Sequence, residues 1–69
     1  MLKTINQKVL ELSGKDLVSF SQRLTDVLNS DSWRAQRGLQ KSDPETILTV
    51  LYKEMFENDF SYLNRYKEN

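Results

Sequence analysis

The sequence contains no cysteine and no histidine, and these two absences exclude several kinds of site. Structural zinc sites are built from cysteine and histidine ligands, and the common nucleophile–base pairs of catalysis need a histidine. A disulfide is equally impossible, and proteins without disulfides are typical of reducing compartments. We therefore expect a cytoplasmic protein that is not an enzyme and that holds no metal and no cofactor.

Long hydrophobic runs and an excess of one sign of charge are also missing. No apolar stretch approaches the ~20 residues that cross a membrane, and residues 1–8 lack the apolar core of a signal peptide. Ten basic and ten acidic side chains cancel, so no strong field draws the chain toward nucleic acid or anionic lipid. We expect neither a membrane nor a small-molecule substrate as partner.

The 69 residues are enough for one domain, residues 1–69, in which a core is marginal without a partner. The spacing of apolar residues predicts an all-α fold. The expected architecture is a small hairpin or bundle of three helices plus one short helical turn, with a long C-terminal helix, and it suits dimerisation into a four-helix-type bundle. The expected bounds are 2–12, 14–29, a turn over 32–37, and 44–66.

Local signals mark where these elements begin and end. Ser13 and Asp16 have the spacing of a capping box before the second helix. Gly38 is placed to stop the short turn, and Asp43 followed by Pro44 is a strong start signal for the last helix. The second helix has one apolar stripe, as expected of a helix with one buried face; it consists of Leu17, Phe20, Leu24, Val27 and Leu28.

The last predicted helix is apolar around more of its circumference than one buried face requires. Its first arc is expected to meet the stripe of the second helix, and it consists of Ile47, Leu48, Leu51, Met55, Tyr62 and Tyr66. A second arc adjoins it and consists of Tyr52, Phe56, Phe60 and Leu63. We interpret the second arc as a homodimer seam or a site for a partner helix. The alternative is that segment 2–12 folds back and covers it.

A basic stretch lies between the second and last helices. Trp33, Arg34, Arg37 and Lys41 occur there with no acidic residue among them. Tryptophan and arginine are enriched at binding hot spots, so the first three form a candidate recognition patch for protein. Stacking on nucleic acid is a second reading, which the neutral net charge disfavours. The third is that Trp33 fills the core while the arginines pair with acids.

Acidic residues on the last helix carry less information. Glu54 and Glu57 are helix neighbours, and Asp59 follows them. Without a histidine or a second carboxylate helix we expect a solvated face rather than a metal site. Asp59 is the exception, because it projects between the two apolar arcs, where it would mark the register of an interface or pair with Arg23 or Arg65.

One run in the last helix resembles a known family. Leu51-Tyr52-Lys53-Glu54-Met55, with Asp59 and Tyr62 after it, is similar to a run in the long helix of the small cyanobacterial phycobilisome-degradation adaptors. The resemblance covers about a dozen residues. It implies a two-helix hairpin that dimerises into a four-helix bundle and delivers antenna proteins for proteolysis. Trp33 and the extra N-terminal helix depart from that pattern.

The sequence as a whole predicts a small non-catalytic adaptor or regulator that binds another protein, itself included, through helix–helix contacts. A homodimer through the last helix is the expected assembly. A nucleic-acid-binding regulator that uses the Trp33–Arg37 turn is the alternative, and an adaptor of the phycobilisome-degradation kind is a weaker one. The sequence does not identify the partner.

Overall fold

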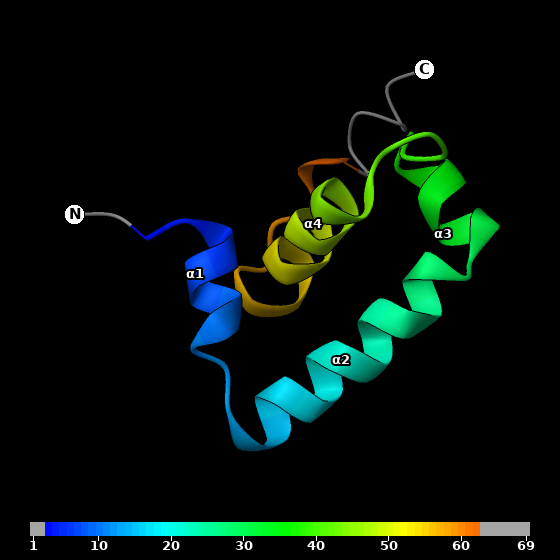
Figure 1. Ribbon diagram of the computed structural model, residues 1–69. Coiled ribbons are helices and arrows are strands. Elements are labelled where there is room, and N and C mark those ends of the chain that lie inside the picture. Colours follow the sequence, from blue (N-terminus) through cyan, green and yellow to red (C-terminus); the bar gives the residue numbers. More distant parts are fainter. Residues whose placement is uncertain (1–2, 63–69) are drawn as a thin grey trace.

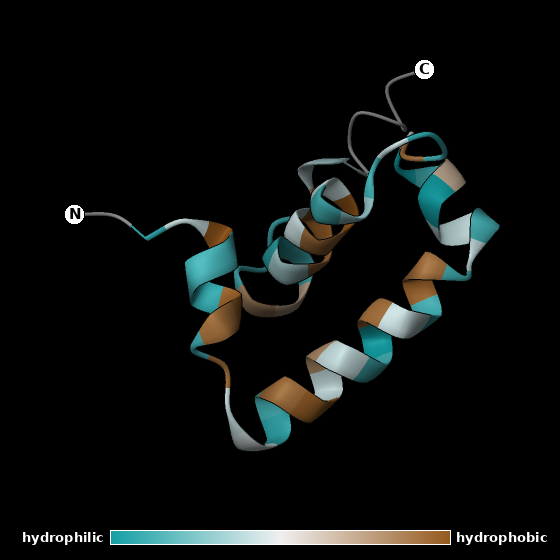
Figure 2. Cartoon of the chain, in the orientation of Figure 1, coloured by the Kyte–Doolittle hydropathy of each residue, from teal (hydrophilic) through white to brown (hydrophobic). Residues whose placement is uncertain are grey.

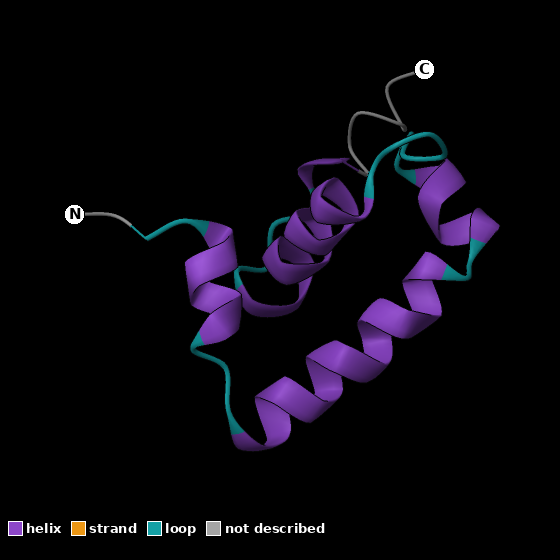
Figure 3. Ribbon diagram, in the orientation of Figure 1, coloured by secondary structure: helices purple, strands orange, loops and turns teal. Residues whose placement is uncertain are grey.

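The computed structural model describes residues 3–62, and in this part of the chain it contains helices and no strand (Figures 1 and 3). The four helices are α1 (Ile5–Leu10), α2 (Gly14–Leu28), α3 (Asp31–Gln36) and α4 (Pro44–Phe56). The predicted all-α bundle is confirmed. The first and last helices are shorter than expected.

The helices α2 and α4 form the centre of the bundle. They pack against each other, α1 packs against α4, and α3 follows directly on α2 at its C-terminal end (Figure 1). The side of α2 that faces away from α4 has no other described helix on it. The outermost surface of the bundle therefore includes a full length of α2.

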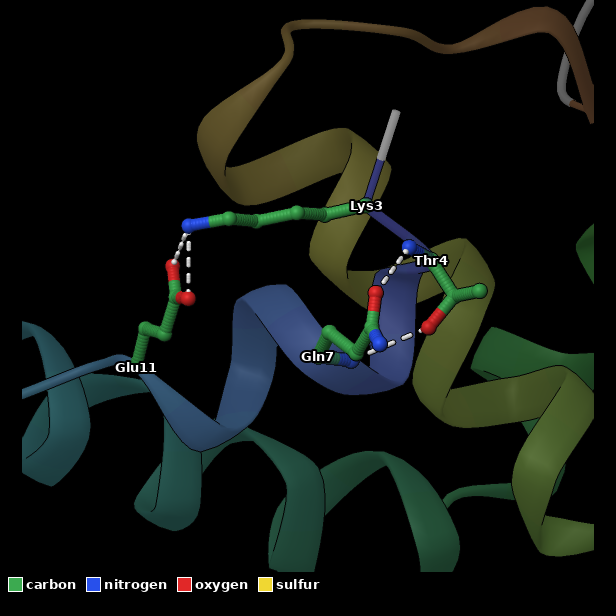
Figure 4. Close-up of polar contacts among 4 residues, drawn as sticks. All are labelled: Lys3, Thr4, Gln7 and Glu11. Carbon is green, nitrogen blue, oxygen red and sulfur yellow. Dashed lines mark hydrogen bonds and ion pairs between the residues drawn. The ribbon is translucent and has the colours of Figure 1, made fainter. Parts of the chain in front are cut away.

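The short helix α1 is stabilised mainly by side chains at its ends. Thr4 and Gln7 form a reciprocal capping box, in which each side chain accepts a hydrogen bond from the other residue's backbone N–H (Figure 4). Lys3 spans the helix and lies 2.6 Å from a carboxylate oxygen of Glu11. Six residues alone would not form a stable helix in water, so these contacts and the packing on α4 hold it.

The start of α2 differs from the prediction. The Ser13 side chain accepts no hydrogen bond, so the capping box expected from Ser13 and Asp16 does not form. Gly14 has φ of +57°, a left-handed conformation that only glycine adopts without strain. The chain therefore enters α2 through a glycine turn rather than through a side-chain cap.

The end of α3 is the predicted glycine stop, and Gly38 has φ of +70°. The Leu39 N–H donates to the Arg34 carbonyl at 2.8 Å and the Gly38 N–H donates to that of Ala35 at 3.2 Å, which together form a Schellman motif. This motif turns Leu39 into the core, where it is buried.

Asp43 caps α4 as the sequence predicts. Its carboxylate accepts a hydrogen bond from the Thr46 N–H at 2.9 Å, and Pro44 occupies the first helical position. Hydrogen bonds from Thr46 hold the pKa of Asp43 below its ordinary value of 3.8. Because the folded state favours the charged form, the cap contributes stability at a pH above this value and loses it as the pH falls through the lowered pKa.

We expect Asp43→Asn to remove this part of the pH dependence, because asparagine still caps a helix but does not titrate. Wild type should lose more stability than the variant when the pH is lowered from 5 to about 2. Urea unfolding followed by circular dichroism at both pH values measures the difference. Parallel losses in the two proteins would show that the Asp43 carboxylate is not charge-stabilised in the fold.

The predicted helix over 44–66 is wrong in length, because α4 ends at Phe56. Asn58 adopts a left-handed φ of +52°, and the Asp59 N–H donates to the Lys53 carbonyl at 3.0 Å. Asp59 in turn accepts a hydrogen bond from the Ser61 N–H. Asparagine tolerates this conformation better than other non-glycine residues, so Asn58-Asp59 is a helix stop that the apolar periodicity masked.

The core is made by one face each of α2 and α4, closed by Trp33 and Leu39. Its buried members are Phe20, Val27, Trp33, Leu39, Ile47, Val50 and Leu51. The stripe predicted for α2 is buried only in part, because Leu17 and Leu28 remain exposed. On α4, Ile47 and Leu51 are buried as predicted, whereas Met55 is exposed. The predicted position Tyr66 lies outside the described residues.

Candidate functional site

Trp33 and Arg37 lie inside the structure, not on an exposed recognition patch. Trp33 is 8% exposed. The Arg37 guanidinium stacks on its ring, with Cζ 4.0 Å from the ring centroid, and donates to the Trp33 carbonyl at 3.0 Å. It also forms a bidentate ion pair with Glu54, with N–O distances of 2.6 and 2.9 Å. This Trp33–Arg37–Glu54 cluster ties α3 to α4.

Arg34, the third residue of the predicted patch, pairs with Asp31 one turn earlier and donates to the Ser30 carbonyl. Both arginines are thus engaged by acidic side chains, and the tryptophan ring faces the core. The prediction of an exposed Trp33–Arg37 surface is wrong, and the alternative in which Trp33 fills the core describes the structure. Nucleic-acid binding by this turn would require these side chains to be free, and they are buried or paired.

Glu54 lies in the interior and not on the solvated face that the sequence predicts. Its side chain is only 9% exposed and that of Arg37 only 8%. Glu54 is seven residues after Ile47 and four after Val50, so it shares their buried face. That spacing was a usable signal, because a carboxylate on a buried helix face needs a cationic partner.

The second apolar arc of α4 is largely occupied within the chain. Tyr52 and Phe56 are half-buried, and their rings lie 6.1 and 6.0 Å from that of Phe20, centroid to centroid. The two α4 rings also contact each other at 4.9 Å. Such distances are typical of stabilising aromatic pairs. Tyr52 and Phe56 are therefore partly covered within the chain, and the homodimer seam assigned to them stays a prediction.

The other two members of that arc have different positions. Phe60 lies beyond the end of α4, in the loop after the Asn58 turn, and is exposed. Leu63 lies outside the described residues. The Leu51–Met55 run that carries the family resemblance is separated by the same turn from Asp59 and Tyr62, so it does not form one continuous helix with them.

The described part of the predicted first segment, residues 3–12, packs against α4. Val9 and Leu12 pack against the core, and Asn6 donates to Glu45 at 3.1 Å. Lys8 pairs with Glu57 at 2.9 Å, and this carboxylate raises the pKa of Lys8. The short helix α1 is thereby attached near both ends of α4.

Several of the exposed apolar residues lie on either side of the link between α1 and α2. Leu10, the last residue of α1, is 84% exposed, and Leu17 and Val18 in the first turns of α2 are 45% and 55% exposed. Figure 2 shows hydrophobic residues at the end of α1 and again at the start of α2. We call these three residues the α1–α2 corner. The sequence interpretation assigned Leu17 to the core and left Leu10 and Val18 unassigned.

Other features of the described residues offer little chemistry. Residues 3–62 contain no group of three carboxylates placed to hold a metal ion. None of the described helices is long and apolar enough to cross a membrane. One shallow, open hollow of about 300 Å³ lies beside the start of α4. Its lining residues are Asp43, Glu45, Thr46, Thr49 and Tyr62. Both of its carboxylates already accept hydrogen bonds, from Thr46 and Asn6.

No protein-family model matches the chain, and neither the curated proteins nor the solved structures contain a match.

Proposed function

We propose that this chain is a cytoplasmic, non-catalytic protein-binding adaptor or regulator that acts through helix–helix contacts. The observation that carries the proposal is the exposure of the α1–α2 corner, Leu10, Leu17 and Val18. Most of the residues that the sequence predicts to bind a partner contact other residues of the chain. We therefore place the proposed contact at this corner and not on α4.

The exposure of Leu10 is the strongest support. A leucine that is 84% exposed at a helix end contributes little to folding. Single exposed apolar residues are ordinary on protein surfaces, but grouped ones favour a binding surface. Here Leu10 lies directly before the three-residue link 11–13, and Leu17 and Val18 lie in the first turns of α2 after it. A partner helix that covers this corner would bury all three apolar side chains.

The alternatives have less support from the described residues. The hollow beside the start of α4 is open, whereas catalysis generally requires polar groups that converge in an enclosed pocket. Trp33, Arg34 and Arg37, which suggested nucleic-acid binding, are buried or paired.

Leu10→Asp tests the proposal, because it places a charge where apolar burial would drive association. Tagged wild-type and variant proteins would be used to capture proteins from cells of the source, with quantitative mass spectrometry as the readout. Partners retained by wild type should fall about tenfold or more with the variant. Ser19→Asp is the matched control, because it adds the same charge at an exposed polar site in α2.

Unfolding midpoints of both variants show that the fold is intact. Retention of the same proteins by wild type and Leu10→Asp would contradict the assignment of the corner. The absence of any protein enriched over an unrelated helical bait would contradict protein binding itself.

A further inference from the structure

One part of the exposed surface of α2 is uncharged along the length of the helix. At about 100° per residue, six exposed residues occupy one arc of roughly 140°. They are Leu17, Val18, Ser21, Gln22, Thr25 and Leu28. We call this set the outer α2 face. No other described helix lies on the side of α2 that faces away from α4 (Figure 1).

Two of the three polar members of the outer α2 face, Ser21 and Thr25, have small side chains. The Thr25 hydroxyl donates to the Ser21 carbonyl at 3.1 Å, which leaves its methyl group available for contact. Ser21 sits near the middle of the helix and has a short side chain. Small residues at such a position allow a second helix to approach closely, while Leu17, Val18 and Leu28 supply apolar area.

The charges of α2 lie on the exposed surface next to the outer α2 face and have a definite pattern. Its four charged residues, Lys15, Asp16, Arg23 and Asp26, fall within an arc of about 100°. Lys15 and Asp26 are the two that border the outer α2 face. They are eleven residues apart, which is about three turns, so they lie on the same edge. Neither forms an ion pair with another described residue.

We propose that the outer α2 face binds a second copy of this chain, with the two α2 helices antiparallel. A two-fold axis beside Ser21 relates the two helices, which run in opposite directions. Each edge of the outer α2 face then lies against the same edge of the other copy. The midpoint between Lys15 and Asp26 falls next to Ser21. Lys15 of each copy therefore lies beside Asp26 of the other, and the pairing occurs twice.

The positions of Lys15 and Asp26 favour a second copy of the chain in the antiparallel direction. In a parallel pair each edge would meet the opposite edge, and Lys15 would not reach Asp26. The face itself is uncharged, so two copies approach without like-charge repulsion, and Leu17 of one copy lies beside Thr25 of the other. The inference deepens the proposed function and rests on it only in requiring protein association. One helix pair is a small interface, so the dimer is weak and reversible.

Sedimentation equilibrium of the full chain over about 10 µM to 1 mM tests the inference, a range that spans weak association. Wild type should show a monomer–dimer equilibrium. Lys15→Glu and Asp26→Lys should each weaken it about tenfold, because each replaces two attractive pairs by two repulsive ones. The double variant Lys15→Glu/Asp26→Lys should restore it, because the reversed charges again face each other. Val18→Asp should weaken it at least tenfold, because it places a charge within the uncharged face.

A strictly monomeric wild type would overturn the inference, and so would a dimer that the charge reversals leave unchanged. Neither result bears on capture of a different protein through Leu10. Loss of dimer in the single charge variants without recovery in the double variant would also overturn the antiparallel arrangement. Unfolding curves of each variant identify any that fails to fold, and the remaining variants then decide the outcome.

Discussion

Replacing Glu54 by leucine should lower the free energy of unfolding by about 3–5 kcal/mol, because it leaves the Arg37 guanidinium buried without its counter-charge. The Glu54 and Arg37 side chains are 9% and 8% exposed, and they are joined by two short hydrogen bonds. A domain of this size has a total stability of only about 3–10 kcal/mol. The single variant should therefore be close to unfolded at room temperature.

The double variant Arg37→Met/Glu54→Leu separates the pair from its surroundings. It removes both charges and fills a similar volume, so it should recover most of the stability that either single variant loses. Urea unfolding of wild type, Arg37→Met, Glu54→Leu and the double variant gives the coupling energy. A cost below about 1 kcal/mol for Glu54→Leu would mean that the pair is solvated like an ordinary surface salt bridge.

Phe20→Ala should cost about 3–5 kcal/mol of unfolding free energy, the range for removing a buried aromatic ring. Phe20 is buried and contacts the rings of Tyr52 and Phe56. The variant should also weaken the near-ultraviolet circular dichroism of Tyr52, because that ring loses its fixed neighbour. Chemical unfolding and the near-ultraviolet spectrum measure the two effects.

Val18→Ala is the matched control, since Val18 lies two residues earlier in the same helix on the outer α2 face. It should leave the stability of the monomer within about 0.5 kcal/mol of wild type. If Phe20→Ala also changed the free energy of unfolding by less than about 0.5 kcal/mol, Phe20 would not hold Tyr52 and Phe56 in place. These two rings would then be free to contact a partner.

Most of the helices could be predicted from local signals. Asp43-Pro44 and Gly38 act through backbone hydrogen bonds and φ preferences within a few residues, and both operate as expected. The end of α4 was missed for the opposite reason. Apolar residues continue at helical spacing through Tyr62, which predicts a longer helix. The left-handed conformation of Asn58 ends the helix instead, and the spacing of apolar residues carries no information on backbone conformation.

The site was harder to predict because its residues depend on contacts between distant segments. A helical projection shows that α4 has two apolar arcs but not that Phe20 reaches the second one. It likewise places Glu54 beside Ile47 without showing that Arg37, seventeen residues earlier in the chain, supplies the counter-charge. The exposure of Leu10 and Leu17 follows from the crossing of α1 and α2 with α4, which composition and spacing do not determine.

The surface through which the chain associates is measured most directly by ¹H–¹⁵N spectra of the full protein recorded over a dilution series. Amides of Leu17, Val18, Ser21 and Thr25 should shift between dimer and monomer. Those of Trp33, Tyr52 and Phe56 should stay in place, because they belong to the core of each copy. Shifts confined to Tyr52, Phe56 and Phe60, with the outer α2 face unchanged, would contradict this assignment and return the interface to α4.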